Sequence, residues 1–342
     1  MLFESILITC FSYINGERTP SSVYHILKGK RSIQTLQDTH IYKLESFYGI
    51  YKQLKRQDFE NRIVKLERAG VLKRYQDSFI VTGTINSKLQ EEQLFNGLTF
   101  YNKVEIFYNR LLLLIQTLTN TKYQSYSFIP VVEDKEAEIW VKKVYKKVKG
   151  KEKDVLKKLY LELYEVLSRV KAVEVGIFVD RLTGYKHYGM SVPQLGEKYK
   201  KSVDDVQLIL VCTIHQIIEN VEKEEKTSLL AFLLQDTLEV SHLTKSAYDT
   251  YLLLLKGKTP DKIAFVRRLK TNTIYDHIVE IALSDSEFAI EDFVNQEDEQ
   301  AITQAITSTN SYKLKDIKAN VNDKISYFQI RLVLAKKNRL HK

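Results

Sequence analysis

The chain has 342 residues, enough for two or three domains, and 44% of them are apolar, enough for each domain to bury a core. Charged residues make up 28% and are mixed in sign, and the aromatic content is high, which together exclude a disordered protein. The longest aliphatic run, Leu111 to Ile115, is far below the roughly 20 residues that a membrane span needs, which excludes a membrane protein.

Glycine and proline, which break helices, occur only 12 and 4 times. Their scarcity predicts a mostly α fold with long helices and short connections. Cys10 and Cys212 lie apart in apolar helical patterns, which is typical of buried thiols in a reducing compartment, so we expect a cytoplasmic protein. The net charge of +9 favours a polyanionic partner such as DNA, although a modest excess also serves solubility.

The first region, residues 1–85, predicts helices followed by a hairpin. Apolar periodicity predicts helices from Leu2, from Pro20 and from Asp58, the last closed by Gly70. Two β-rich runs, 71–75 and 79–81, flank a polar turn and predict a β-hairpin. This order is that of a winged-helix-like domain, in which Lys73 and Arg74 would lie on the wing. The alternative is a small structural hairpin that covers the core.

The second region, residues 86–235, is predicted to be nearly all helix, with long helices near 94–118, 133–149 and 154–173. Residues 189–206 also carry a helix-turn-helix-like spacing, in which Leu195 and Gly196 form an aliphatic–small pair. Lys201 occupies the position where that motif needs an apolar turn residue, so a plain helical hairpin is the alternative.

The densest positive charge lies in this second region, between residues 142 and 158. Nine lysines stand there against Glu152 and Asp154, which leaves a net charge of +7. Four of them project opposite the apolar stripe of their helix and are predicted to bind DNA phosphates by counterion release: Lys142, Lys143, Lys146 and Lys147. The alternative is a solvated helix face.

The third region, residues 236–342, contains a helix-turn-helix spacing at 257–278. The motif needs an aliphatic–small pair, an apolar turn residue and a β-branched residue eleven positions after the first. Ile263 and Ala264, Leu269, and Ile274 meet these requirements. The spacing therefore predicts two helices that cross closely at Ala264.

In a DNA-bound module of this kind, exposed residues at the start of the second helix enter the major groove. The candidates for base or phosphate contact here are Thr271, Asn272, Thr273 and Tyr275. Arg267, Arg268 and Lys270 lie beside them and are predicted to hold the DNA backbone. Asp276 and Glu280 would repel phosphates, so protein docking by this module is the alternative.

Two runs, LLLLKGKTPDKIAFVRRLKTNTIYDHIVEIA and LKDIKANVNDKISYFQIRLVLAKK, resemble the helicase helix-turn-helix family. The resemblance is strong over about the last hundred residues, and SSVYHILKGKRSIQTLQD extends it toward the N-terminus. This domain occurs at the C-terminus of some RecQ-type DNA helicases and in a stand-alone bacterial protein encoded beside such a helicase. The resemblance implies a DNA-binding accessory protein that works with a RecQ-type helicase in DNA repair or recombination.

The acidic stretch from Glu287 to Glu299 suits DNA poorly. It is instead a candidate docking surface for a basic helicase face, with Glu297, Asp298 and Glu299 as partner-binding residues; the alternative is a solvated linker. Gly257-Lys258-Thr259 looks like the end of a phosphate-binding loop, but Leu252 stands where the loop needs glycine. We therefore expect a non-enzymatic protein without cofactor, metal or small-molecule substrate. A transcriptional regulator and a protein-only scaffold remain alternatives.

Overall fold

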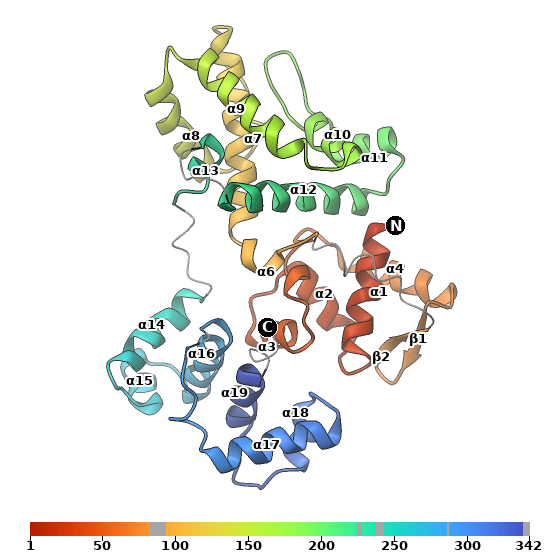
Figure 1. Ribbon diagram of the computed structural model, residues 1–342, viewed down its shortest axis with the longest axis vertical. Helices are drawn as coiled ribbons and strands as arrows, with labels where there is room; N and C mark the ends of the chain where they lie inside the picture. Colours follow the sequence, from red (N-terminus) through yellow and green to blue (C-terminus); the bar gives the residue numbers. More distant parts are fainter. Residues whose placement is uncertain (83–93, 224–227, 237–242, 286, 338–342) are drawn as a thin grey trace. The chain divides into compact units, whose positions relative to one another are not determined.

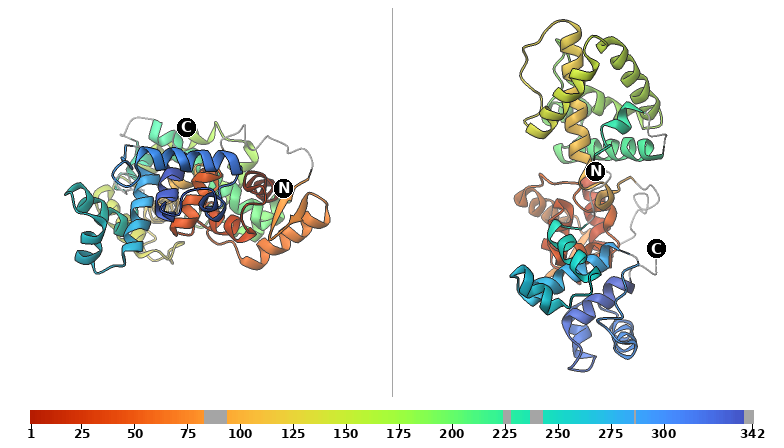
Figure 2. Two further views of the ribbon diagram at one scale, coloured as in Figure 1. Left: turned by 90° about the horizontal axis from the view of Figure 1, so that it is seen from below. Right: turned by 90° about the vertical axis from the view of Figure 1, so that its left-hand side faces the viewer.

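The computed structural model describes residues 1–82, 94–223, 228–236, 243–285 and 287–337 (Figures 1 and 2). The chain forms two compact units. One, called the middle unit, consists of residues 1–6 and 87–240, and the other, called the terminal unit, consists of residues 7–86 and 241–342. Apart from one two-stranded sheet, the regular structure of the described residues is helical, which confirms the predicted mostly α fold.

The middle unit is built around two long helices, α7 and α12. Its helices are α6 (Gly97–Phe100), α7 (Lys103–Lys122), α8 (Lys135–Val148), α9 (Glu152–Leu167), α10 (Ala172–Asp180), α11 (Val192–Tyr199), α12 (Val203–Lys223) and α13 (Leu229–Phe232). Helices α8 and α9 both pack on α7 (Figure 1). Leu111 and Leu114 of α7 share the core with Leu210 and Ile217 of α12.

Helix α8 is fixed at both its start and its middle. Asp134 caps it by accepting hydrogen bonds from the backbone N–H groups of Glu136 and Ala137. Trp140 lies against the guanidinium of Arg110 on α7, 4.7 Å from its ring centroid. Arg110 in turn donates to the carbonyl oxygen of Leu233 and forms an ion pair with Asp236. The orientation of α8 relative to α7 therefore follows from specific contacts.

The terminal unit joins segments from both ends of the chain. The N-terminal segment contains α1 (Leu2–Ile14), which starts in the middle unit, and α2 (Pro20–Lys28), α3 (Ile33–Ile41), η1 (Glu45–Phe47), α4 (Arg56–Arg68), β1 (Leu72–Tyr75) and β2 (Ser78–Val81). The strands pair antiparallel, Leu72 opposite Val81, which confirms the predicted hairpin. The C-terminal segment contains α14 (Lys245–Leu255), α15 (Pro260–Arg267), α16 (Thr271–Ser284), α17 (Gln296–Thr309), α18 (Leu314–Ala319) and α19 (Tyr327–Lys337).

Helix α16 is the central helix of the terminal unit. It packs against α14 and α15 on one side and against α3 and α19 on others. Its buried residues point in all directions around its axis: Ile274, His277, Ile278, Val279, Glu280, Ile281 and Ala282. Arg331 of α19 bridges to both neighbouring elements, since its guanidinium pairs with Asp276 at 2.6 Å and donates to Gln37 of α3 at 3.1 Å. Segments 7–86 and 241–342 therefore pack as one body.

Candidate nucleic-acid interface

Helices α15 and α16 form the predicted helix-turn-helix pair. Ile263, Ala264 and Ile274 are all buried at the crossing. Arg268 ends α15 in the left-handed conformation, with φ of 53°, and the next backbone N–H, that of Leu269, donates to the carbonyl oxygen of Ala264 at 3.0 Å. The chain therefore reverses direction within a tight turn, as the spacing predicted.

The residues that were predicted to contact DNA through this motif differ in their exposure to solvent. Arg268, Lys270 and Asn272 are exposed, whereas Thr271 and Thr273 are half-buried. Tyr275 is also half-buried, and its ring stacks on that of Phe328 with centroids 4.1 Å apart. Arg267 faces α14. Its guanidinium donates to the carbonyl oxygen of Ser246 at 2.7 Å and to the hydroxyl of Thr250, and lies 3.6 Å from Asp249.

The two acids of α16 are engaged inside the fold. The Asp276 carboxylate pairs with Arg331. Glu280 is buried and accepts hydrogen bonds from the backbone N–H and the hydroxyl of Thr244, and burial raises the pKa of its carboxyl. Because α3 and α19 also cover α16, its exposed residues are confined to its two ends, at Asn272 and Ser284. DNA contact at the N-terminal end of this helix would use Asn272 together with Arg268 and Lys270, which precede the helix.

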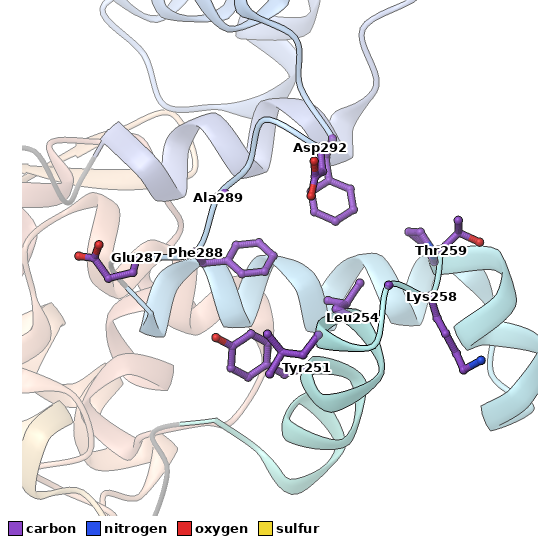
Figure 3. A pocket seen from close by; sticks show the side chains of 12 residues that line it. Tyr251, Leu254, Lys258, Thr259, Glu287, Phe288, Ala289 and Asp292 are labelled. Atoms are coloured by element: carbon purple, nitrogen blue, oxygen red, sulfur yellow. The ribbon is translucent and has the colours of Figure 1, made fainter.

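An open cleft of about 450 Å³ lies beside the turn between α14 and α15 (Figure 3). Tyr251 and Leu254 of α14 line one side, and Phe288 faces them. Lys258, Glu287 and Asp292 also line the cleft and give it mixed charge. Apolar walls with two carboxylates are unsuited to a phosphate backbone.

The acidic stretch from Glu287 to Glu299 belongs to the terminal unit, and its last three acids lie in the first turn of α17. Asn295 caps this helix, because its Oδ1 accepts a hydrogen bond from the Asp298 N–H at 2.8 Å. The Asn295 amide in turn donates to the Asp298 carboxylate at 3.0 Å. Glu299 forms an ion pair with Lys336 at 3.0 Å. Glu297 is exposed, whereas Asp298 and Glu299 are half-buried.

Helices α8 and α9 present the largest group of exposed lysines that sequence analysis singled out. The apolar stripe of α8, including Val141 and Val144, is buried against α7, and the lysines stand on its other face. The neighbouring acids take part in two long ion pairs, Lys142–Glu138 at 3.6 Å and Lys158–Glu162 at 3.8 Å. All nine lysines are exposed, and we call them the lysine face: Lys142, Lys143, Lys146, Lys147, Lys149, Lys151, Lys153, Lys157 and Lys158.

The weaker spacing at 189–206 also forms a helix pair, α11 and α12. Ser191 caps α11 in a reciprocal arrangement with Gln194, and Leu195 and Gly196 are buried at the crossing. The second helix carries Asp204 and Asp205 in its first turn, and Asp205 is buried and accepts a hydrogen bond from the backbone N–H of Phe3 at 2.9 Å. The geometry of the α11–α12 pair therefore suits packing within the unit better than contact with DNA.

Sequence analysis missed a group of tyrosines near the end of α7. Tyr123 and Tyr185 stack with ring centroids 4.6 Å apart, although 62 positions separate them in the sequence.

 The fold therefore brings Tyr123 and Tyr185 together from distant parts of the chain. The only sequence signal is a pair of Tyr-x-x-Tyr runs in predicted connections, Tyr123 to Tyr126 and Tyr185 to Tyr188.

Among the residues that the structure describes, no helix is long and apolar enough to cross a membrane. The same residues contain no group of three or more histidine, cysteine, aspartate or glutamate side chains arranged to hold a metal ion.

Comparison with known proteins identifies the family. A family described as "Helix-turn-helix domain" matches residues 246–334, which include α15 and α16. Protein YpbB of Bacillus subtilis (strain 168) is 32% identical over 343 residues, which cover 98% of this chain and 97% of that protein. No solved structure matches the chain. Because the similarity to YpbB extends over nearly the whole chain, and because its C-terminal part matches a helix-turn-helix domain, the chain belongs to the YpbB family of helix-turn-helix proteins.

Proposed function

We propose that this protein is a non-enzymatic, DNA-binding accessory protein, and that the lysine face of α8 and α9 holds the DNA backbone. The observation that carries the proposal is the exposure of all nine lysines between residues 142 and 158, where the only acidic residues are Glu152 and Asp154. A helix-turn-helix domain, common in DNA-binding proteins, supports it from a second part of the chain.

The physical basis of this binding is the release of counterions from the DNA. Each lysine that neutralises a phosphate releases condensed cations, a term that does not depend on base sequence. Lysine ammonium groups are compact point charges without the planar fork that reads guanine edges. Binding through the lysine face is therefore strong at low salt and has little sequence preference. Arg268, Lys270 and Asn272 supply a second, smaller contact edge on the helix-turn-helix pair.

Salt-dependent binding to duplex DNA tests this proposal. If about four to six phosphates are neutralised, the affinity falls by roughly two to three orders of magnitude between about 50 and about 200 mM salt. Replacing four exposed lysines of α8 by glutamine flattens the dependence on salt: Lys142, Lys143, Lys146 and Lys147. A matched control removes the same charge from exposed lysines of the terminal unit: Lys30, Lys43, Lys55 and Lys65. Equal slopes for the two variants would remove the lysine face from the interface.

We further propose that the partner of this protein is a RecQ-type DNA helicase, and that the two act in DNA repair or recombination. The support is the resemblance of residues 248–283 and 311–337 to the helicase helix-turn-helix family. An accessory chain that holds DNA would raise the effective concentration of substrate at a helicase core to which it is bound. The exposed acids Glu287, Asp292 and Glu297 form the docking surface for a basic helicase face.

Size-exclusion chromatography of the protein with a RecQ-type helicase from the same host tests this partnership. Co-elution at micromolar concentration is expected, and it weakens when Glu287, Asp292 and Glu297 are changed to lysine. Asp298 and Glu299 are left intact because they take part in contacts within the unit. Separate elution of the two proteins, without an effect on unwinding rate, would contradict the partnership while leaving DNA binding by the lysine face untouched.

One observation favours a protein-docking function for the helix-turn-helix pair itself. Phe265 and Val266 of α15 and Leu255 of α14 are exposed, and Phe265 retains 86% of its accessible surface. Exposed apolar side chains of this size are typical of protein contact surfaces. The scaffold function is therefore compatible with DNA binding elsewhere in the chain.

A further inference from the structure

The end of α7 gathers exposed aromatic and basic side chains from two loops. Tyr123 directly follows α7 and stacks on Tyr185 of the α10–α11 connection, with an angle of 19° between the rings. Tyr126 and Tyr188 extend from the same two loops and are 67% and 86% exposed. We call Tyr123, Tyr126, Tyr185 and Tyr188 the tyrosine cluster.

The α10–α11 loop holds its two tyrosines in a fixed turn. Gly184 and His187 exchange two backbone hydrogen bonds, of 2.9 and 3.1 Å, which close the turn around Tyr185 and Lys186. The backbone N–H of Tyr185 donates to the hydroxyl of Thr119 on α7 at 3.2 Å. Gly184 permits this close approach, since a Cβ there would lie 3.1 Å from the same hydroxyl oxygen. The turn is therefore anchored on α7.

The loop that carries Tyr126 is anchored on α7 in a similar way. The buried side chain of Gln116 accepts a hydrogen bond from the Val131 N–H at 2.9 Å and donates to the carbonyl oxygen of Ile129 at 3.0 Å. The Ser125 N–H donates to the carbonyl oxygen of Asn120 at 3.0 Å. Both loops are therefore held in place on α7. This lowers the entropic cost of ordering them when a ligand binds.

Positive charge surrounds the tyrosine cluster. Lys122 lies over the ring of Tyr123, and Lys186 lies over that of Tyr185, at 5.2 and 5.3 Å from the centroids. The lysine face continues from here, because α8 packs on α7 and its Tyr145, which lies near Thr121 at the end of α7, is followed by Lys146 and Lys147. Two nearby carboxylates are engaged: that of Glu152 accepts the N–H of Gly150 at 3.0 Å, and that of Asp180, which interacts with His187, pairs with Lys198. The surface therefore favours a polyanion.

We propose that the tyrosine cluster binds single-stranded DNA by stacking unpaired bases on Tyr126 and Tyr188. This inference rests on the proposed function, because it assigns the form of DNA that reaches the lysine face. Exposed aromatic rings beside lysines fit a chain of alternating bases and phosphates, and stacking of a base on an aromatic ring tolerates any sequence. In a duplex the base faces are covered by neighbouring base pairs, so the same rings gain nothing from it.

The experiment compares a fluorescein-labelled oligothymidine with a duplex of the same length, using fluorescence anisotropy on the full chain. Tyr126→Ala with Tyr188→Ala weakens binding of the single strand by about 30-fold or more and binding of the duplex by less than about twofold. Tyr126→Phe with Tyr188→Phe keeps most of the affinity, because the aromatic ring remains. Tyr248→Ala with Tyr327→Ala is the matched control, since both side chains are exposed in the terminal unit.

An unchanged affinity for the single strand in the alanine variant overturns this inference, as does an equal loss for single strand and duplex. In either case the salt dependence of duplex binding and its loss in the lysine variant still support the proposed function. If the unmodified protein binds neither form of DNA, both proposals fail together.

Discussion

His215 of α12 is a buried histidine whose surroundings keep it neutral. Its ring lies edge-on to Phe95 and Phe100, with centroids 6.0 and 5.4 Å away. Its Nδ1 accepts a hydrogen bond from the backbone N–H of Asn96 at 3.0 Å, which requires the unprotonated nitrogen. Burial lowers the pKa of His215 to about 3.

This histidine makes the stability of the middle unit depend on pH. In the unfolded chain its pKa is about 6.5, so between about pH 6.5 and about pH 3 the unfolded state binds a proton that the folded state does not. Stability is therefore complete above about pH 6.5 and falls below it, by up to about 1.4 kcal/mol per pH unit. Urea unfolding at about pH 7.5 and about pH 5 measures this slope.

His215→Gln removes the titrating group. The number of protons taken up on unfolding, which sets the slope of stability against pH, should therefore fall by close to one. The variant is compared with the unmodified protein at each pH, so that a general loss of stability cancels. The same pH dependence in both proteins would show that another group dominates acid destabilisation.

At the scale of helices, the helix-turn-helix crossing and the hairpin were confirmed, whereas two helix bounds were wrong. The predicted helix 94–118 is divided into α6 and α7, and the predicted helix 154–173 ends as α9 at Leu167 before α10 begins at Ala172. The spacing of Ile263, Ala264 and Ile274 fixed the crossing of α15 and α16, because only a small residue lets two helices approach so closely. The polar turn at Gln76 and Asp77 was also identified, since both flanking runs are rich in β-branched and aromatic residues. Each of these features depends on residues within eleven positions of each other, so that its pattern is visible in a short stretch of sequence.

The burial of α16 beneath other helices could not be predicted from a short stretch of sequence. It comes from α3 and α19, elements from the two ends of the chain, and contacts such as Gln37 with Arg331 have no local signature. The same limit applies within the candidate site. Arg267 and Arg268 are neighbours, but the left-handed conformation of Arg268 turns one inward and the other outward. The stacking of Tyr123 on Tyr185 likewise joins two distant loops.

At the scale of the whole molecule, the two units carry different surfaces. The middle unit presents the lysine face and the tyrosine cluster, which suit a polyanion. In the terminal unit, the second helix of the helix-turn-helix pair is largely enclosed, and the cleft beside the pair combines apolar walls with carboxylates. These differences support the proposal that DNA binds chiefly to the middle unit and that a protein partner binds to the terminal unit.

The most direct test of this assignment is chemical footprinting of lysines on the full chain. The protein is acetylated with and without duplex DNA, and the modified lysines are identified by mass spectrometry. The account predicts that DNA protects Lys142, Lys143, Lys146 and Lys147, while exposed lysines such as Lys30 and Lys55 react as before. Unchanged reactivity of the four lysines of α8, with protection confined to Lys270 beside α16, would contradict it.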